Sequence, residues 1–245
     1  MIISLCIPNM NRTHDLKKVL PSIVESANES PPVEIVIVNY SSRDDLETYI
    51  AEAQSMMPLS EGNFWTYAKL DGKQYYNSAH ARNLCVVASK GEYIVQLATD
   101  IMPSKQFVAR VRVILEAERP VWMCEGEGII GHTRVPWMGR LLICLRDEFM
   151  AAGGYDERFK FYAPEDKDIC SRLYRRGGKF WKLPESLVTE IATPYRDKLR
   201  NLDLRPFAND TQKKLAMARL MHPIYEENNR LGVLVANPNG WGLWE

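Results

Sequence analysis

Hydrophobic and polar residues alternate along the first hundred positions in blocks that predict strands and helices in turn. Segments 2–8, 33–38, 64–70 and 93–97 are largely apolar, and we expect each of them to form a strand. Between the first two, apolar residues recur at steps of three and four from Leu16 to Ala27, which predicts a helix with a kink or restart at Pro21. Helices are also expected over 43–53 and after Ser78, which can cap the second of them. This order predicts an α/β fold, a mostly parallel central sheet flanked by helices.

The second half of the chain is less regular. Helices are predicted over 106–118 and 166–176, a strand over 141–145, and an extended segment over 121–124. Segment 126–139 contains several glycines, and we expect it to be a loop and a candidate flexible lid. From about Pro194 the chain becomes polar, with one short helix over 211–221 and a turn-rich end. We therefore expect one domain over 1–195 and a C-terminal extension, 196–245, packed on it.

Composition and charge restrict the possible partners. The chain has 31 Lys and Arg and 31 Asp and Glu, so no overall field attracts a polyanion, which argues against nucleic acid as a partner. Its 5 cysteines are odd in number and form no C-x-x-C pair, which favours buried free thiols in a reducing cytosol. The first residues lack the basic leader of a signal peptide, and no apolar run approaches the ~18 residues of a membrane span. We expect a cytoplasmic protein with no transmembrane segment.

Polar residues follow three of the predicted strands, at the ends where parallel α/β sheets bind ligands. Asn9, Asn11 and Arg12 follow the first strand, Asn39 follows the second, and Asp100 follows the fourth. Each segment alone also suits an ordinary turn or helix N-cap, because Asn, Ser and Asp favour both. Three such segments at one edge of the sheet predict a shared crevice.

Two charged features stand at predicted helix starts. Arg82 lies in the first turn of its helix, where its charge opposes the helix dipole; a bound phosphate would remove that conflict, and a tolerant surface arginine is the alternative. Glu165, Asp166 and Asp168 lie together at another helix start, where acidic residues stabilise a helix by themselves. Three neighbouring carboxylates also repel one another, which argues for a metal, a sugar hydroxyl group or a role as a base.

These segments resemble the inverting glycosyltransferases of family two, which have the GT-A fold. SLCIPNMNR resembles the opening strand and turn of that family, and EIVIVNYSSRDD resembles its second strand. ARNLCVVASKGEYIVQLATDIMP resembles the helix and strand that lead into the D-x-D metal motif. GGYDERF followed by PEDKDICSRL resembles the acceptor-side segment with its E-D base motif. The four pieces occur in the family order and span about residues 1–193, which implies a single GT-A domain.

The resemblance implies a role for each matching residue. Asp166 matches the general base, Glu165 its acidic neighbour, and Asp100 the last aspartate of D-x-D, which binds Mn²⁺ or Mg²⁺. The residues expected to bind the nucleotide-sugar are Pro8, Asn9, Asn11, Arg12, Asn39, Arg82 and Thr99. The implied reaction is metal-assisted, inverting transfer of a sugar from a nucleotide-diphosphate-sugar, with a UDP-sugar favoured, to a hydroxyl group of a glycan or another acceptor.

The chain also departs from the family pattern. Ala98 stands at the first D-x-D position, and Asn39 replaces the acidic residue after the second strand. Glu190 stands where many members have a metal-binding histidine, and we expect it to bind the same hard cation. Ala98 and Glu190 keep open a non-catalytic module of this fold that binds nucleotide-sugars or glycans. A nucleotidyltransferase is the other alternative, although CIPNMNR lacks the glycine-rich basic loop of such enzymes.

Overall fold

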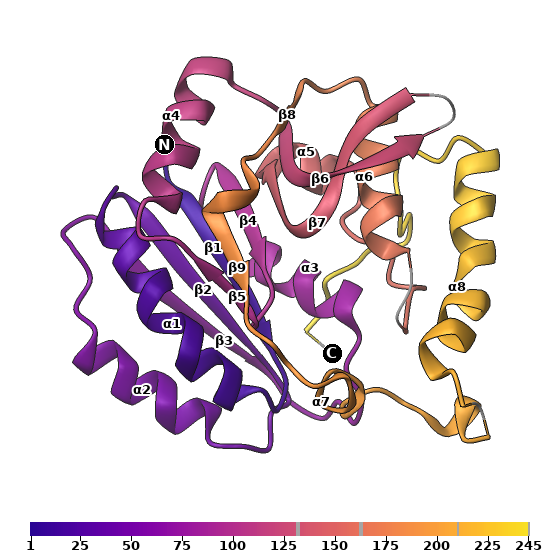
Figure 1. The fold of residues 1–245 in the computed structure, drawn as a ribbon, viewed down its shortest axis with the longest axis horizontal. Coiled ribbons are helices and arrows are strands. Elements are labelled where there is room, and N and C mark those ends of the chain that lie inside the picture. The colour runs from indigo at the N-terminus through magenta and orange to yellow at the C-terminus, as the bar shows by residue number, and fades with distance from the viewer. Residues whose placement is uncertain (131–132, 162–163, 210, 245) are drawn as a thin grey trace.

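The computed structural model describes residues 1–130, 133–161, 164–209 and 211–244, and it places a central sheet between two layers of helices (Figure 1). The strands are β1 (Ile3–Asn9), β2 (Val33–Tyr40), β3 (Phe64–Leu70), β4 (Tyr93–Leu97), β5 (Ile101–Pro103), β6 (Trp122–Ile130), β7 (Thr133–Leu145), β8 (Phe180–Lys182) and β9 (Val188–Glu190). The α-helices are α1 (Thr13–Asn28), α2 (Leu46–Met56), α3 (Ser78–Ala88), α4 (Phe107–Glu118), α5 (Arg146–Ala151), α6 (Glu165–Arg175), α7 (Tyr195–Leu199) and α8 (Lys213–Arg230). Short 3-10 turns cover Glu185–Leu187 and Arg205–Phe207.

The main sheet has seven strands in the order β3-β2-β1-β4-β7-β6-β8. Strands β3, β2, β1 and β4 run parallel to one another, whereas β7 pairs antiparallel with both β4 and β6, and β8 runs parallel to β6. A second, two-stranded sheet pairs β5 with β9. The predicted mostly parallel α/β sheet is confirmed. Its parallel strands end at one edge, which brings the segments after β1 and β4 together.

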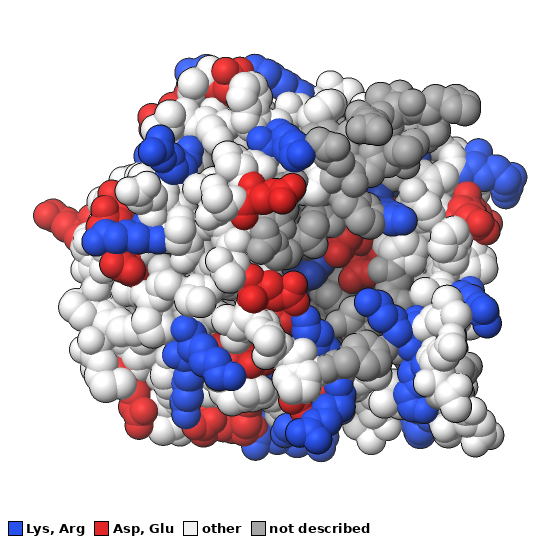
Figure 2. All heavy atoms as spheres, in the orientation of Figure 1, with Lys and Arg blue, Asp and Glu red and all other residues white. Residues whose placement is uncertain are grey.

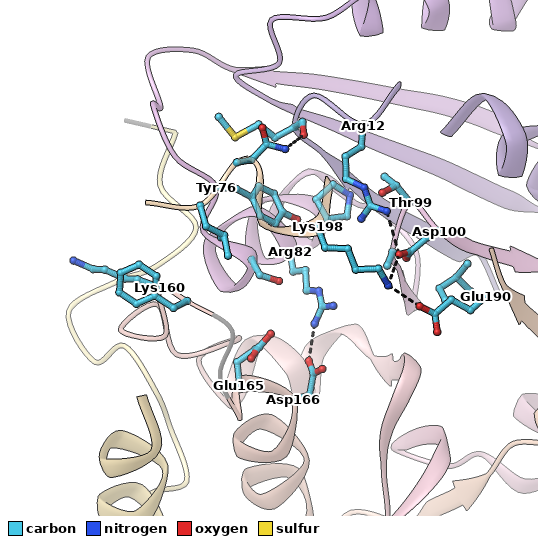
Figure 3. Close-up of a pocket in the computed structure, with 18 residues that line it drawn as sticks. Arg12, Tyr76, Arg82, Thr99, Asp100, Lys160, Glu165, Asp166, Glu190 and Lys198 are labelled. Carbon is cyan, nitrogen blue, oxygen red and sulfur yellow. Dashed lines mark hydrogen bonds and ion pairs between the residues drawn. The ribbon is translucent and has the colours of Figure 1, made fainter. Parts of the chain in front are cut away.

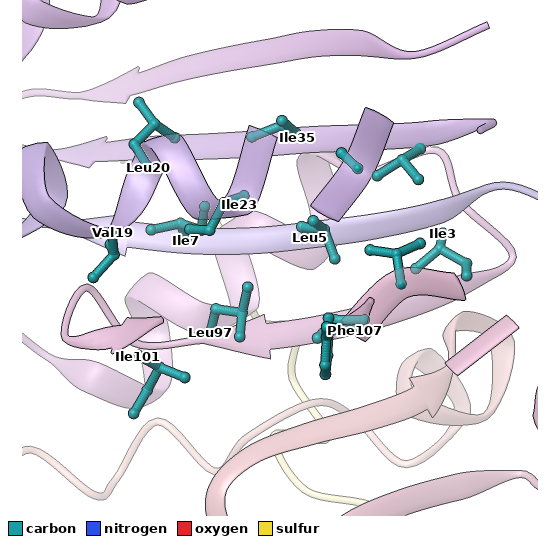
Figure 4. Packing of buried hydrophobic residues seen from close by; sticks show 14 of the residues in the cluster. Ile3, Leu5, Ile7, Val19, Leu20, Ile23, Ile35, Leu97, Ile101 and Phe107 are labelled. Atoms are coloured by element: carbon teal, nitrogen blue, oxygen red, sulfur yellow. The ribbon is translucent and has the colours of Figure 1, made fainter. Parts of the chain in front are cut away.

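Two apolar layers hold the sheet between its helices. Ile3, Leu5 and Ile7 of β1 are fully buried against α1 and α4, as Figure 4 shows. Alternate positions of the same strands face the opposite layer, where Cys6 and Val36 belong to a second apolar cluster that includes residues of α3 and α6. Because β1 and β2 are covered on both faces, their sequences are almost continuously apolar, which explains why they could be predicted. Full burial of each such aliphatic side chain contributes about 1.5–3 kcal/mol.

The boundaries of α1 and α3 differ from the predictions, and α2 begins at Leu46 and not at residue 43. Helix α1 continues through Pro21 from Thr13 to Asn28, so the predicted restart is absent. Helix α3 is capped by Asn77, whose side chain accepts a hydrogen bond of 3.1 Å from the backbone N–H of His80. Ser78 is therefore the first helical residue and not the cap. The helix ends at Ala88.

The prediction of a loop over 126–139 is wrong. Most of this segment belongs to the antiparallel pair β6 and β7, in which Gly126 lies opposite Trp137. The register shifts between Cys124 and Gly126, so the irregularity that the glycines signal is a bulge and not a loop. Residues 131 and 132, at the turn between the strands, lie outside the described residues.

The C-terminal extension contacts the domain at several points. Its long helix α8 runs beside α6 at one edge of the molecule (Figure 1). Asn228 of α8 donates hydrogen bonds to the buried carboxylates of Asp156 and Asp168, at 3.1 and 2.8 Å. Further on, the backbone N–H of Gly242 donates to Glu157. The helix predicted over 211–221 corresponds to α8, which is longer than expected. The domain boundary at residue 195 stays a prediction.

Candidate active site

A cavity of about 300 Å³ opens at the edge where β1 and β4 end, between α3, α6 and the segment that contains α7. Eight of the residues singled out from the sequence line it, and they come from five separate segments: Pro8, Arg12, Arg82, Thr99, Asp100, Glu165, Asp166 and Glu190. Figure 3 shows Asp166 and Asp100 on two walls of this cavity, with basic side chains between them. The crevice predicted from the strand ends is therefore present.

Asp100 is held by two cations. The Arg12 Nη2 atom lies 3.1 Å from Asp100 Oδ2, and Lys198 Nζ lies 3.0 Å from the same oxygen. Lys198 Nζ also donates to Glu190 Oε1 at 2.7 Å. Pairing of β5 with β9 fixes this arrangement, because the backbone carbonyl of Asp100 accepts from the N–H of Ile191 at 2.9 Å. Asp100, directly before β5, and Glu190, in β9, therefore lie side by side and share one lysine.

The charges in this cluster stabilise one another. Burial acts to raise the pKa of Asp100, but the positive charges of Arg12 and Lys198 outweigh burial and hold that pKa below its ordinary value. Burial acts to lower the pKa of Lys198, yet its hydrogen bonds to Glu190 and Asp100 raise the pKa above the ordinary value. Lys198 and Asp100 are therefore both charged at neutral pH.

The opposite wall carries a second ion pair. Arg82 of α3 donates from Nη1 to Asp166 Oδ1 at 2.6 Å, and its guanidinium group lies 5.3 Å from the ring centroid of Tyr155. Burial acts to lower the pKa of Arg82, while the charge of Asp166 raises it well above the ordinary value. Asp166 stands in the first turn of α6, with 28% of its side chain exposed. A carboxylate is thus fixed at the cavity wall and open to a ligand.

The structure separates the three carboxylates at the start of α6. Glu165 and Asp166 line the cavity. Asp168 is only 1% exposed and accepts a hydrogen bond of 2.8 Å from Arg172, one turn further along the helix. Successive helical residues are turned by about 100°, so Asp166 and Asp168 point to nearly opposite sides. The repulsion inferred from the sequence is relieved by this separation and by the two arginine partners.

Three asparagines expected to bind nucleotide do not line the cavity. Asn9 and Asn39 each accept, at 3.1 and 2.8 Å, from the backbone N–H three residues later, a local bond between side chain and backbone that stabilises turns and helix starts. Asn11 accepts from the backbone N–H of Arg43 at 2.6 Å. These bonds match the turn-forming alternative. Contact of the three side chains with a nucleotide stays a prediction.

The other cavity residues were not expected from the sequence to bind a ligand. Beyond the residues above, the lining comprises Met10, Tyr76, Ser78, Ala98, Ile101, Lys160, Phe161, Asn201 and Leu202, together with Lys198. Asn201 connects the C-terminal extension to the turn after β1, because its Nδ2 atom donates to the carbonyl of Met10 at 2.6 Å. Lys198 lies in a polar stretch without helical or strand periodicity, so no local pattern marks it.

The residues at Asp100 do not fit a resident divalent cation. Within the described part of the chain, no three His, Cys, Asp or Glu side chains gather closely enough to hold a metal. The two carboxylates that do approach each other, Asp100 and Glu190, are bridged by the ammonium group of Lys198. An ion between them would have to displace a positive charge. The expectation of Mn²⁺ or Mg²⁺ at these residues therefore stays a prediction that this donor set does not support.

The sheet order and the position of the cavity define a GT-A-like glycosyltransferase fold. A model of the family "Glycosyl transferase family 2" matches residues 4–184. The chain therefore belongs to glycosyl transferase family 2, as its resemblance had implied. No curated protein sequence matches it significantly. None of the helices in the described residues combines the length and apolar character that a membrane crossing requires.

Solved structures share the fold at low sequence identity. The crystal structure of S. aureus TarS 1–349 in complex with UDP superposes with a TM-score of 0.64 at 14% identity, over 89% of this chain and 70% of that one. The complex of the same protein with UDP-GlcNAc gives 0.63 at 12% identity, over 96% and 80%. The mannosyltransferase PcManGT from Pyrobaculum calidifontis, in complex with GDP-Man and Mn²⁺, gives 0.59 at 17% identity, over 94% and 73%. The likeness covers only 41% of a longer TarS chain.

Proposed function

We propose that this glycosyltransferase inverts the anomeric configuration and that Asp166 is its general base. The observation that carries the proposal is the shared cavity: Asp166 on α6 and Asp100 after β4 face the same space. The ends of β1 and β4 supply Arg12, Thr99 and Asp100 to the side where a parallel sheet binds nucleotides. The α6 wall then remains for the acceptor. A volume of about 300 Å³ is at the lower end of small-molecule sites.

The transfer needs one proton movement and one displacement. An acceptor hydroxyl group gives its proton to the Asp166 carboxylate, and the acceptor oxygen forms a bond to the anomeric carbon. The bond between that carbon and the diphosphate oxygen breaks, and the electron pair leaves with the nucleoside diphosphate. Attack on the face opposite the leaving group inverts the configuration. Arg82 holds Asp166 in position through a bond of 2.6 Å, which fixes the direction of the proton transfer.

The donor is a nucleotide-diphosphate-sugar in this proposal, and the acceptor is a glycan or another molecule with a hydroxyl group. UDP and UDP-GlcNAc are bound in the TarS structures and GDP-Man in the PcManGT structure, which supports this donor class. A UDP-sugar is the favoured donor. The Mn²⁺ of PcManGT belongs to that protein, and no step above passes through a metal ion.

Replacement of Asp166 by asparagine tests the mechanism. Asp166→Asn keeps a hydrogen-bond acceptor for Arg82 but removes the base, so turnover should fall by about 10²- to 10⁴-fold, the usual contribution of general-base catalysis. Binding of the nucleotide should change by less than about threefold, because Asp166 lies on the acceptor wall. Transfer and hydrolysis are measured against a panel of nucleotide-sugars, and binding by calorimetry.

The control is Asp147→Asn, which removes an exposed carboxylate from the first turn of α5. It should leave transfer unchanged. An Asp166→Asn protein with normal transfer would refute the assignment of the base. A wild-type protein that binds nucleotide-sugars but neither transfers nor hydrolyses them would support the binding-module alternative. Release of pyrophosphate in place of a nucleoside diphosphate would identify a nucleotidyltransferase.

A further inference from the structure

We propose that Lys198, together with Arg12, supplies the positive charge that neutralises the diphosphate of the donor, so that donor binding requires no divalent cation. The inference rests on the proposed function, because it concerns the same cavity. It is carried by the position of one side chain from the C-terminal extension, beyond the residues that the family model matches. Figure 3 shows Lys198 reaching across the cavity to Asp100 and Glu190.

The first step is the geometry of the ammonium group. Lys198 Nζ lies 3.0 Å from Asp100 Oδ2 and 2.7 Å from Glu190 Oε1, which places it between the two carboxylates expected to bind a metal. Arg12 contacts Asp100 from another direction, at 3.1 Å. Arg12 and Lys198 therefore bring two positive charges to Asp100 and Glu190, and Asp15 is a further carboxylate partner of Arg12. A divalent cation would bring the same total charge to the same place.

The second step is the composition of the motif. A divalent cation prefers several oxygen ligands, whereas an ammonium group needs one hydrogen-bond acceptor for each of its three N–H bonds. Ala98 removes one carboxylate that the D-x-D motif provides. The loss would weaken a metal site. The missing carboxylate does not weaken the binding of a lysine that already has two carboxylate acceptors. A site that uses Lys198 in place of a metal ion therefore explains both the alanine at position 98 and the position of the lysine.

The third step is the capacity to hold a phosphate. Two of the three N–H bonds of Lys198 are directed at Asp100 and Glu190, which leaves one for a donor oxygen. Lysine binds phosphate as a point charge, and arginine adds directed hydrogen bonds. The Arg12 guanidinium is itself held in place by Asp15, at 3.0 Å from Nε and 2.8 Å from Nη2. Both cations are thus positioned before a donor arrives.

The test is calorimetric binding of UDP, GDP, ADP and dTDP to protein stripped with EDTA, repeated in excess Mn²⁺. For wild type, we expect at least one nucleotide to bind in EDTA, with a dissociation constant that Mn²⁺ changes by less than about threefold. Lys198→Met should weaken that binding in EDTA by roughly 10- to 100-fold, the range for hydrogen bonds to charged groups. Mn²⁺ should then restore part of the affinity, because Asp100 and Glu190 have lost their lysine.

The matched control is Lys105→Met. Lys105 also bridges two carboxylates, Glu25 at 3.4 Å and Glu29 at 3.1 Å, but it lies in the turn between β5 and α4, away from the cavity. Its replacement should leave nucleotide binding unchanged with and without Mn²⁺. Lys198→Arg, which keeps the charge, should retain most of the affinity in EDTA. Electron paramagnetic resonance should detect bound Mn²⁺ in Lys198→Met and not in wild type, a readout independent of activity.

The possible failures are distinguishable. Wild-type binding that appears only with Mn²⁺ would overturn the inference and leave the proposed function intact. Unchanged affinity of a folded Lys198→Met protein in EDTA would overturn it as well, as would equal loss in Lys198→Arg. Absence of nucleotide binding under both conditions would overturn the inference and the proposed function together.

Discussion

Replacement of Arg172 by methionine should destabilise the protein strongly. Arg172 is fully buried and forms an ion pair with Asp168, at 2.8 Å. It also donates to the backbone carbonyls of Ala152 at 2.6 Å and Gly154 at 2.7 Å. One side chain therefore ties α6, whose first turn carries Asp166, to the loop that precedes it.

The magnitude follows from what methionine leaves behind. Methionine retains the aliphatic volume, but the Asp168 carboxylate loses its cation and keeps only the hydrogen bond of 2.8 Å from Asn228. Removal of one partner from a buried ion pair costs about 3–5 kcal/mol, because the other charge stays buried. With both side chains at most 1% exposed, solvent offers little compensation. The loss is a large part of the ~5–15 kcal/mol that stabilises a typical protein.

Urea denaturation followed by circular dichroism measures this change. The midpoint should fall with an unchanged slope, and the melting temperature should fall by about 6–20 °C for a chain of this size. Arg110→Met, at an exposed position of α4, is the control and should stay within about 0.5 kcal/mol of wild type. In a double-mutant cycle with Asp168→Asn, the two losses should be less than additive. A cost below about 1 kcal/mol for Arg172→Met would refute the reasoning.

Two further predictions concern the contacts between the domain and the C-terminal extension. Gly153→Ala should destabilise the protein by more than about 2 kcal/mol in urea denaturation, because its φ of 73° is strained for alanine and the new methyl group would overlap the carbonyl oxygen of Ala236. Gly72→Ala is the control, because Gly72 has a φ of 85° but open space around it, so this variant shows the backbone cost alone. Equal losses of stability in the two variants would contradict the overlap. Burial acts to raise the pKa of Asp156, but hydrogen bonds from Arg158 and Asn228 hold that pKa below its ordinary value. The contribution of Asp156 to the free energy of unfolding is therefore present above about pH 4 and lost as the pH falls below that. Acid denaturation of Asp156→Asn should lack this loss of stability, and a profile identical to that of wild type would contradict the prediction.

The parallel half of the sheet could be predicted because burial on both faces leaves a local record. The observed strands β3 and β4 have the predicted bounds, Phe64–Leu70 and Tyr93–Leu97. The hairpin of β6 and β7 could not be predicted in this way, because strand pairing is not recorded in the local sequence and glycine occurs in both loops and bulges. The three-residue strands β5 and β9 are too short to show a period.

The candidate site was predictable to the same extent. Asp100 follows from topology, because it stands at a strand end of the parallel sheet, whereas Asp166 was indicated by a cluster of carboxylates at a helix start and by the family resemblance. The different environments of Asp166 and Asp168 follow from helix geometry, but only once Arg172 and Asn228 are known to be the partners of Asp168. The position of Lys198 in the cavity depends on the path of the chain around α7, and no local sequence pattern specifies that path.

The charge of the cavity is accordingly divided between two parts of the chain. Residues within the family match supply the ion pair of Asp166 and Arg82 and the carboxylate of Asp100. Lys198, a cation that contacts this carboxylate, comes from beyond the match. Lys and Arg side chains interleave with Asp and Glu across the face in Figure 2, so donor binding depends on individual positions and not on an overall field. If Lys198 has the role proposed above, a relative that shares the sheet and the Asp166 carboxylate but differs after residue 184 would neutralise its diphosphate in another way, by a metal ion or by a different side chain.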